Sequence, residues 1–232
     1  MNKYIKLLAG TVVAVSLWSC SKYDEPDPEI MYYPSIELEG DQYIYIETGG
    51  SFVEPGYLAI KDGQEASDEV IVTNNIDNTT PGLYEVNYDI YNEYGYSAKA
   101  TRYVMVTVPG DIVAGFYEVQ PDSYRDYNGI TPYGNRYIIN VVGYGDGTYY
   151  VDDILGGWYY YRAGYGFNYA LQGEISVDDD GNITLEDSFL IGWGDSAESL
   201  DDGIFDASAN TISWVVTYTD NPLIFHVNMI KL

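Results

Sequence analysis

The chain has 232 residues, with 36 acidic and 10 basic side chains, a single histidine and a single cysteine, and its formal net charge is −26. So acidic a protein repels nucleic acid and anionic lipid headgroups, and we therefore exclude nucleic acid as a partner. The single cysteine excludes an internal disulfide. The single histidine, His226, argues against a Ser-His-Asp or Cys-His catalytic set and against a histidine-rich zinc site.

The N-terminus predicts a signal peptide over residues 1–19. Two lysines precede an apolar run, Leu7 to Leu17, that has the length of a signal-peptide core and is too short to span a bilayer. The run ends in Leu-Trp-Ser-Cys, which resembles the lipobox of bacterial lipoproteins and implies cleavage before Cys20 and lipidation of that residue. An ordinary secretory signal with a chance cysteine is the alternative. Cleavage removes two lysines and no acid, which moves the formal charge from −26 to −28.

A lipidated tether is predicted over residues 20–35. Its prolines and charges favour an extended spacer, and two or more acyl chains on Cys20 would give stable membrane anchoring. The acidic pair Asp24 and Glu25 resembles the surface-export signal of Bacteroidota lipoproteins. This resemblance implies an outer-membrane protein that is exposed on the cell surface.

Beyond the tether, alternating polar and apolar residues recur and no long stretch has helical periodicity, so we expect an all-β protein of two domains. The first covers residues 36–108, with strands at 84–91 and 101–108 around a turn. The segments "FVEPGYLAIKDG" and "PGLYEVNYDIYNEYGYSAKATRYVMV" resemble the bacterial Ig-like domain of surface proteins. This resemblance implies a β-sandwich that acts as a spacer and carries no catalytic residues.

The second domain covers residues 109–232 and is predicted to be an antiparallel barrel-like or sandwich domain. Its segments "YGNRYIINV", "GTYYVDDILGGWY" and "FHVNMIKL" resemble the C-terminal β-domain of Bacteroidota lipoproteins of polysaccharide-utilisation systems. That resemblance implies a role in handling glycans at the cell surface. The predicted strands are 116–120, 136–142, 148–153, 158–162, 169–177, 183–185, 211–218 and 223–230.

Residues that could support catalysis or bind a metal do not form a convincing set. His226 alternates with apolar neighbours and is expected to face solvent, and Asp152 and Asp153 point to opposite faces of their predicted strand, so they are poor partners for glycoside hydrolysis. The acidic run at 178–182 departs from a calcium loop and predicts a hairpin turn. A cation at the acidic segment 195–206 is left open. We expect no enzyme activity, no cofactor and no metal site.

The segment Gly156 to Gly166, "GGWYYYRAGYG", is the strongest candidate for a binding site. As a strand it would place Tyr159 and Tyr161 in the core. Trp158, Tyr160 and Arg162 would then lie on the solvent-facing side. Aromatic rings pack against the C–H faces of sugars, and charged groups beside them bind hydroxyls. Alternatively, the tryptophan packs under a loop and the arginine pairs with an acid. The candidate glycan-binding residues are Trp158, Tyr160, Arg162, Asp153 and Trp193.

Two functions from different classes follow from these features. The first is a non-catalytic, lipid-anchored surface protein that binds glycan in a polysaccharide-utilisation system. The second is a structural or partner-binding subunit that docks on an outer-membrane transporter or binding protein.

Overall fold

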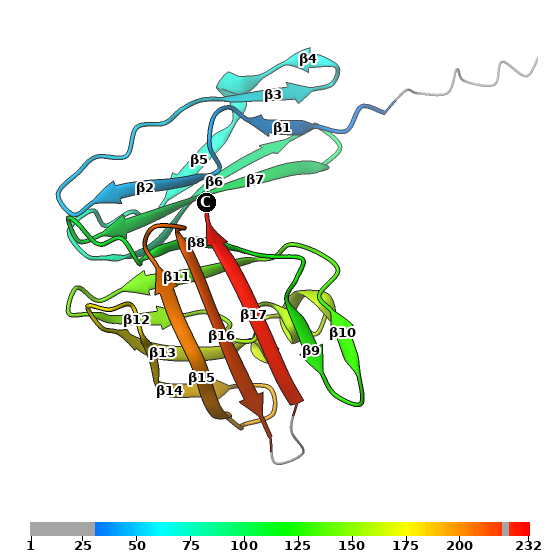
Figure 1. Ribbon diagram of the computed structural model, residues 1–232. Helices are drawn as coiled ribbons and strands as arrows, with labels where there is room; N and C mark the ends of the chain where they lie inside the picture. The colour runs from blue at the N-terminus through cyan, green and yellow to red at the C-terminus, as the bar shows by residue number, and fades with distance from the viewer. Residues whose placement is uncertain (1–30, 220–222) are drawn as a thin grey trace, which may run out of the picture. The chain divides into compact units, whose positions relative to one another are not determined.

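The computed structural model describes residues 31–219 and 223–232, so the predicted signal peptide and lipidation site at Cys20 lie outside the described residues. Residues 33–232 form one compact unit. Seventeen strands and three short helices make up the secondary structure of the described residues (Figure 1). The prediction of an all-β protein is confirmed.

The N-terminal segment is an Ig-like sandwich of two small sheets. Its strands are β1 (Ser35–Leu38), β2 (Tyr43–Glu47), β3 (Tyr57–Lys61), β4 (Gln64–Glu65), β5 (Ile71–Asn74), β6 (Gly82–Tyr91) and β7 (Ser97–Thr107), with the 3-10 helix η1 (Ser67–Glu69) before β5. One sheet has the order β1-β3-β4 and the other β2-β7-β6-β5, in which β2 runs parallel to β7. Apolar side chains from both sheets pack together, so the core lies between them.

Strands β6 and β7 are neighbours in one sheet, and each places alternate side chains against the core. Val86, Tyr88 and Ile90 of β6 are buried while their neighbours are more exposed, as expected for a strand with one face against a core. Arg102 of β7 lies on the same buried side as Val104 and is fully buried. Both strands predicted in this region are confirmed.

The C-terminal segment is one curled antiparallel sheet. Its strands are β8 (Gly115–Val119), β9 (Tyr124–Asp126), β10 (Ile130–Pro132), β11 (Ile138–Gly143), β12 (Thr148–Val151), β13 (Leu171–Val177), β14 (Ile183–Leu190), β15 (Ala197–Asp206), β16 (Thr211–Tyr218) and β17 (Leu223–Lys231). The order is β15-β16-β17-β8-β11-β12-β13-β14, and β17 also pairs with β9, which pairs with β10. Bridges at Asn182–Ile204 and Leu190–Asp195 connect the two ends, so the sheet curls back on itself (Figure 1).

The concave face of this sheet holds the main hydrophobic core. Ile212, Trp214, Val216 and Tyr218 of β16 alternate inward, as their sequence pattern predicts. The Trp214 indole also donates a hydrogen bond to the backbone oxygen of Ile154, at 2.8 Å. This satisfies the ring nitrogen inside the core, where an unpaired polar group would be costly.

The strand predictions for this segment were wrong at two places. Residues 158–162 do not form a strand: they form a short π-helix, η2 (Trp158–Arg162), which is followed by the 3-10 helix η3 (Phe167–Tyr169). Gly156 and Gly157 precede η2 with φ of 61° and 82°, a left-handed conformation that turns the chain out of the sheet direction. The predicted strands also leave out residues 195–206, most of which form β15 and pair with β16.

Candidate functional site

The turn that leads into η2 is built around Asp153. This carboxylate accepts backbone hydrogen bonds through Oδ1 from Leu155 at 2.9 Å and Leu171 at 3.3 Å, and through Oδ2 from Gly157 at 3.1 Å. Asp153 is only 1% exposed, and burial, together with the charge of Asp152, raises its pKa well above the usual range. The prediction that Asp153 lies at a ligand-binding surface is therefore corrected, since it holds the backbone of the turn.

Trp158 is the second predicted site residue that lies inside the protein. It is 3% exposed, and the rings of Tyr133 and Phe225 pack against it edge-on, with centroids at 5.0 and 5.8 Å. Two guanidinium groups lie over the same ring, that of Arg125 at 4.6 Å and that of Arg162 at 4.2 Å. Trp158 is thus a buried support for two arginines and offers no free face to a sugar.

The helical geometry of η2 also changes where its tyrosines point. Tyr159 is buried as predicted, but Tyr161, predicted to lie in the core, is 40% exposed. Tyr160 is partly buried and stacks on Tyr161, with ring centroids 3.8 Å apart. Both line a cleft of about 300 Å³ that also includes Tyr43 and Tyr103 of the Ig-like segment. In a helix neighbouring residues do not alternate between two faces, so Tyr160 does not share a surface with Trp158.

A different set of rings forms an open aromatic surface. Tyr165, Tyr169 and Trp193 surround one hollow of about 380 Å³ and are called the aromatic face below. Tyr165 is 55% and Trp193 46% exposed, and the rings of Tyr169 and Trp193 contact each other at 5.1 Å. Tyr159 lies beneath them, with its ring edge-on to that of Trp193. Of the predicted site residues, Trp193 therefore belongs to this surface.

The position of Trp193 is set by a tight turn between β14 and β15. The backbone nitrogen of Gly192 donates to the oxygen of Asn168 at 2.7 Å, and that of Gly194 donates to Leu190 at 2.8 Å. A Cβ at position 192 would lie 2.6 Å from the Tyr169 ring, so only glycine allows this close approach. The turn is therefore clamped against η3, which places Trp193 beside Tyr169.

Sequence reasoning missed Tyr165 and Tyr169 as members of this surface. Tyr165 stood within the tyrosine-rich segment that was singled out, and Tyr169 was assigned to the next strand. Only the residue composition pointed to them. Their approach to Trp193 depends on the turns at Gly164 and Gly166, which have φ of 72° and 88°, and these turns leave no periodic signal.

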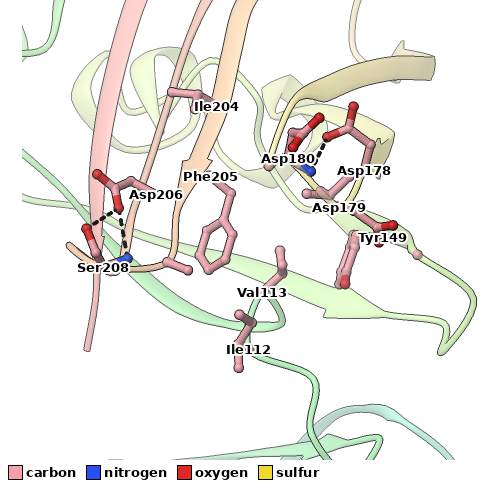
Figure 2. Close-up of a pocket in the computed structure, with 14 residues that line it drawn as sticks. Ile112, Val113, Tyr149, Asp178, Asp179, Asp180, Ile204, Phe205, Asp206 and Ser208 are labelled. Atoms are coloured by element: carbon pink, nitrogen blue, oxygen red, sulfur yellow. Dashed lines mark hydrogen bonds between the residues drawn. The ribbon is translucent and has the colours of Figure 1, made fainter.

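A second pocket in the C-terminal segment is acidic and lies elsewhere. It measures about 670 Å³ and is lined by Val113, Phe205, Asp178 and Asp206, among others (Figure 2). Two of its acids stabilise the turns in which they lie. Asp178 accepts a hydrogen bond from the backbone nitrogen of Asn182 at 2.8 Å, and Asp206 accepts one from the backbone nitrogen of Ser208 at 2.8 Å. Hydrogen bonds from the Asn182 side chain and the Ser208 hydroxyl, followed by backbone hydrogen bonds, lower the pKa of the Asp178 and Asp206 carboxyls respectively. The hairpin turn predicted at 178–182 is confirmed.

His226, the single histidine, packs against another ring. His226 is partly buried and stacks on Tyr124, with ring centroids 4.2 Å apart. Within residues 31–219 and 223–232, no group of three or more histidine, cysteine or acidic side chains is arranged to hold a metal ion. Over the same residues, no helix has the length and apolarity needed to cross a membrane.

The fold and the family comparisons define a two-domain bacterial protein. Residues 36–106 match the family model of the bacterial surface protein Ig-like domain, which confirms the first resemblance, and residues 107–231 match the model of a family of C-terminal domains. The second match spans more than half of the chain, so the chain belongs to that family. A search of curated proteins found no match.

A solved structure makes the comparison more specific. The crystal structure of a lipoprotein from Bacteroides thetaiotaomicron is similar, with a TM-score of 0.74 and 35% sequence identity, over 86% of this chain and 100% of the other. This chain is thus related over both domains to a Bacteroides lipoprotein. The relationship agrees with the lipoprotein resemblance of the N-terminus.

Proposed function

We propose that this protein is a non-catalytic surface lipoprotein that binds glycan through the aromatic face and serves a polysaccharide-utilisation system. The observation that carries the proposal is the exposure of Tyr165 and Trp193, which surround a single pocket together with the partly buried Tyr169. Exposing large rings forfeits burial energy of about 1.5 to 3 kcal/mol each, so a cluster of them marks a surface that a ligand covers. Pyranose rings offer flat C–H faces that such side chains bind.

The anchoring part of the proposal rests on Cys20 and on the related Bacteroides lipoprotein. We propose that lipid on Cys20 holds the protein in the outer membrane with the Ig-like domain and the C-terminal domain exposed at the cell surface. The match to a surface-protein Ig-like family supports this placement. Radiolabelled acyl-chain incorporation that is lost in Cys20→Ala, with protease accessibility on intact cells, tests it.

The non-catalytic part of the proposal is supported by the hydrogen bonds of two neighbouring acids. Asp153 is committed to three backbone hydrogen bonds, and Asp152 accepts hydrogen bonds from the backbone and the side-chain nitrogens of Asn140. A glycosidase needs one carboxyl group to donate a proton and a second to attack or activate water. Release of reducing sugar by the purified protein would contradict this part.

Affinity gel electrophoresis with a panel of soluble polysaccharides tests glycan binding. We expect Trp193→Ala and Tyr165→Ala each to weaken retention by about tenfold, as expected for the loss of one stacked ring. Tyr144→Ala is the matched control, because Tyr144 is exposed to a similar degree but lies in the turn between β11 and β12. Unchanged retention of both ring variants on every retained polysaccharide would show that the aromatic face is not the site.

The alternative function, docking on an outer-membrane transporter or binding protein, is favoured by one feature of the Ig-like segment. Strand β5 is an edge strand, and its Ile71 and Val72 are exposed. Exposed apolar edge strands are available for pairing with another chain. Co-purification of a stoichiometric partner from outer membranes, lost in Ile71→Lys and without retention on any polysaccharide, would establish this function instead.

A further inference from the structure

Two arginines in the C-terminal domain have no carboxylate partner although the protein is strongly acidic. Among the described residues there are seven lysines and arginines, and four of them form ion pairs with acids: Lys61, Lys99, Arg102 and Arg136. Lys231 donates to a backbone oxygen. Arg125 and Arg162 remain, and both lie over the ring of Trp158.

The two guanidinium groups lie over the same ring. Their distances to the same ring centre, 4.6 and 4.2 Å, add to 8.8 Å, which is the upper limit for their separation. Both charges also act on Tyr133: burial raises the pKa of its hydroxyl, and the two nearby arginines partly oppose that rise. Two positive charges on one buried ring make the local potential positive, and an anion bound by either guanidinium would offset it.

The hydrogen bonds of these arginines leave donors unused. Arg162 is exposed, and its Nε donates to the backbone oxygens of Pro132 and Tyr133 at 3.2 and 3.1 Å, which fixes the base of the guanidinium. Its terminal nitrogens form no hydrogen bond with the described residues. The Nε of Arg125 is buried and finds no acceptor among the described residues. Guanidinium groups with free donors bind carboxylate and sulfate oxygens in pairs of parallel hydrogen bonds.

The arginine pair adjoins the aromatic face through Tyr159. Burial raises the pKa of the Tyr159 hydroxyl, while the nearby Arg125 guanidinium lowers it, so these two groups are neighbours. The ring of Tyr159 contacts that of Trp193 at 4.8 Å. Trp158, which carries both arginines, and Tyr159, which lies beneath Trp193, also contact the same ring, that of Phe225, so the arginine pair and the aromatic face are supported by neighbouring core residues.

We propose that Arg125 and Arg162 bind the anionic groups, carboxylate or sulfate, of an acidic polysaccharide whose sugar rings lie on the aromatic face. The proposal rests on the glycan-binding function proposed above and names its substrate class. The negative charge of the protein as a whole does not forbid it, because charges are screened beyond about 8 Å at physiological salt and the local pair governs contact. The same negative charge disfavours polyanions everywhere else on the surface.

Matched polysaccharides separate the anionic group from the sugar backbone. Polygalacturonate is compared with its methyl-esterified form, and chondroitin sulfate with unsulfated chondroitin, so that the first pair tests a carboxylate and the second a sulfate. The full-length mature protein carries Arg125→Gln, Arg162→Gln or both. Arg136→Gln is the control, because it removes the same charge from an exposed arginine that already pairs with Glu118.

We expect the wild type to bind at least one charged polymer at least tenfold more tightly than its matched partner. Each arginine variant should weaken that binding about tenfold, while Arg136→Gln changes it less than twofold. Urea unfolding of each variant checks that the fold is kept, and Arg162→Lys, which keeps the charge but loses the paired donors, should recover only part of the affinity.

The outcomes separate this inference from the function on which it rests. Binding that is lost in Trp193→Ala but unchanged in both arginine variants, or equal for charged and uncharged polymers, would overturn the inference and leave glycan binding in place. No retention of any polymer in either pair, or in the wider panel, would overturn both.

Discussion

The ring of Tyr159 stands edge-on to the ring of Trp193, with centroids 4.8 Å apart and an interplanar angle of 85°. Tyr159 lies in the short helix η2 and Trp193 lies in the turn after β14, so the contact joins two segments of the C-terminal domain that are distant in the sequence. Tyr159 is buried and Trp193 is half exposed, so the pair connects the core to the aromatic face. Substitution of a buried ring should therefore lower the stability of the fold, whereas substitution of an exposed ring should mainly weaken binding.

The first prediction compares two tryptophans. Trp193→Ala should lower the free energy of unfolding by about 1 kcal/mol, because much of this ring is already in water. Trp214→Ala should cost about 3 to 5 kcal/mol, because it removes a fully packed ring and leaves the Ile154 oxygen without its donor. Urea denaturation followed by circular dichroism measures both. Equal losses in the two variants would show that Trp193 is a core residue.

The second prediction concerns the turn before η2. Asp153→Ala should lower the free energy of unfolding by about 3 kcal/mol or more, because three buried backbone donors, at residues 155, 157 and 171, lose their acceptor. Asp153→Asn keeps one oxygen acceptor and should lose less. Thermal unfolding of both variants decides this, and an alanine variant as stable as the wild type would contradict the assigned role.

Trp214 and the segment Trp158 to Arg162 show which parts of the structure the sequence pattern could and could not predict. The strand predicted at 211–218 is confirmed as β16, and its alternation matches the buried face that includes Trp214, because a strand with one buried face leaves a period of two in the sequence. The same logic failed for Trp158 to Arg162, where the glycines at 156 and 157 adopt positive φ and the chain turns into a helix. A run of aromatic residues in the sequence does not by itself distinguish a strand from a short helix.

The aromatic face was only partly predictable for a related reason. Trp193 was included among the candidate residues, but its partners come from a turn and a short helix that carry no periodicity. Strand β15 was missed because its acidic residues hid a strand with two irregularities in register. The sequence therefore predicted most of the strands, but it did not predict the contacts between residues that are distant in the chain.

The third prediction concerns Arg102, which is fully buried in the Ig-like segment. Its Nη2 donates to the backbone oxygens of Glu39 and Gly56, both at 3.0 Å, and to the Glu54 carboxylate at 3.2 Å. Arg102→Lys cannot satisfy these acceptors from one ammonium group, so it should cost about 3 kcal/mol. Arg136→Lys, at an exposed ion pair, should cost under about 1 kcal/mol. Comparable melting temperatures for the two variants would contradict the prediction.

The fourth prediction is a pH dependence that originates at Asp152. Burial raises the pKa of this carboxyl to about 6, although hydrogen bonds from Asn140 oppose the rise. Because the pKa is higher in the folded than in the unfolded chain, the ionised group destabilises the fold. The loss is absent below about pH 4, grows as the pH rises, and is complete above about pH 6, where it amounts to about 3 kcal/mol.

Asp152→Asn tests this contribution, since it removes the titrating group and keeps every other one in the chain. The substitution also removes a charge that raises the pKa of Asp153, and this second effect has the same sign. The asparagine variant should therefore gain stability over the wild type between pH 4 and pH 7, beyond any constant offset from its altered hydrogen bond with Asn140. Urea unfolding of both proteins at half-unit pH steps measures the difference, and a difference that stays constant with pH would show that Asp152 titrates normally.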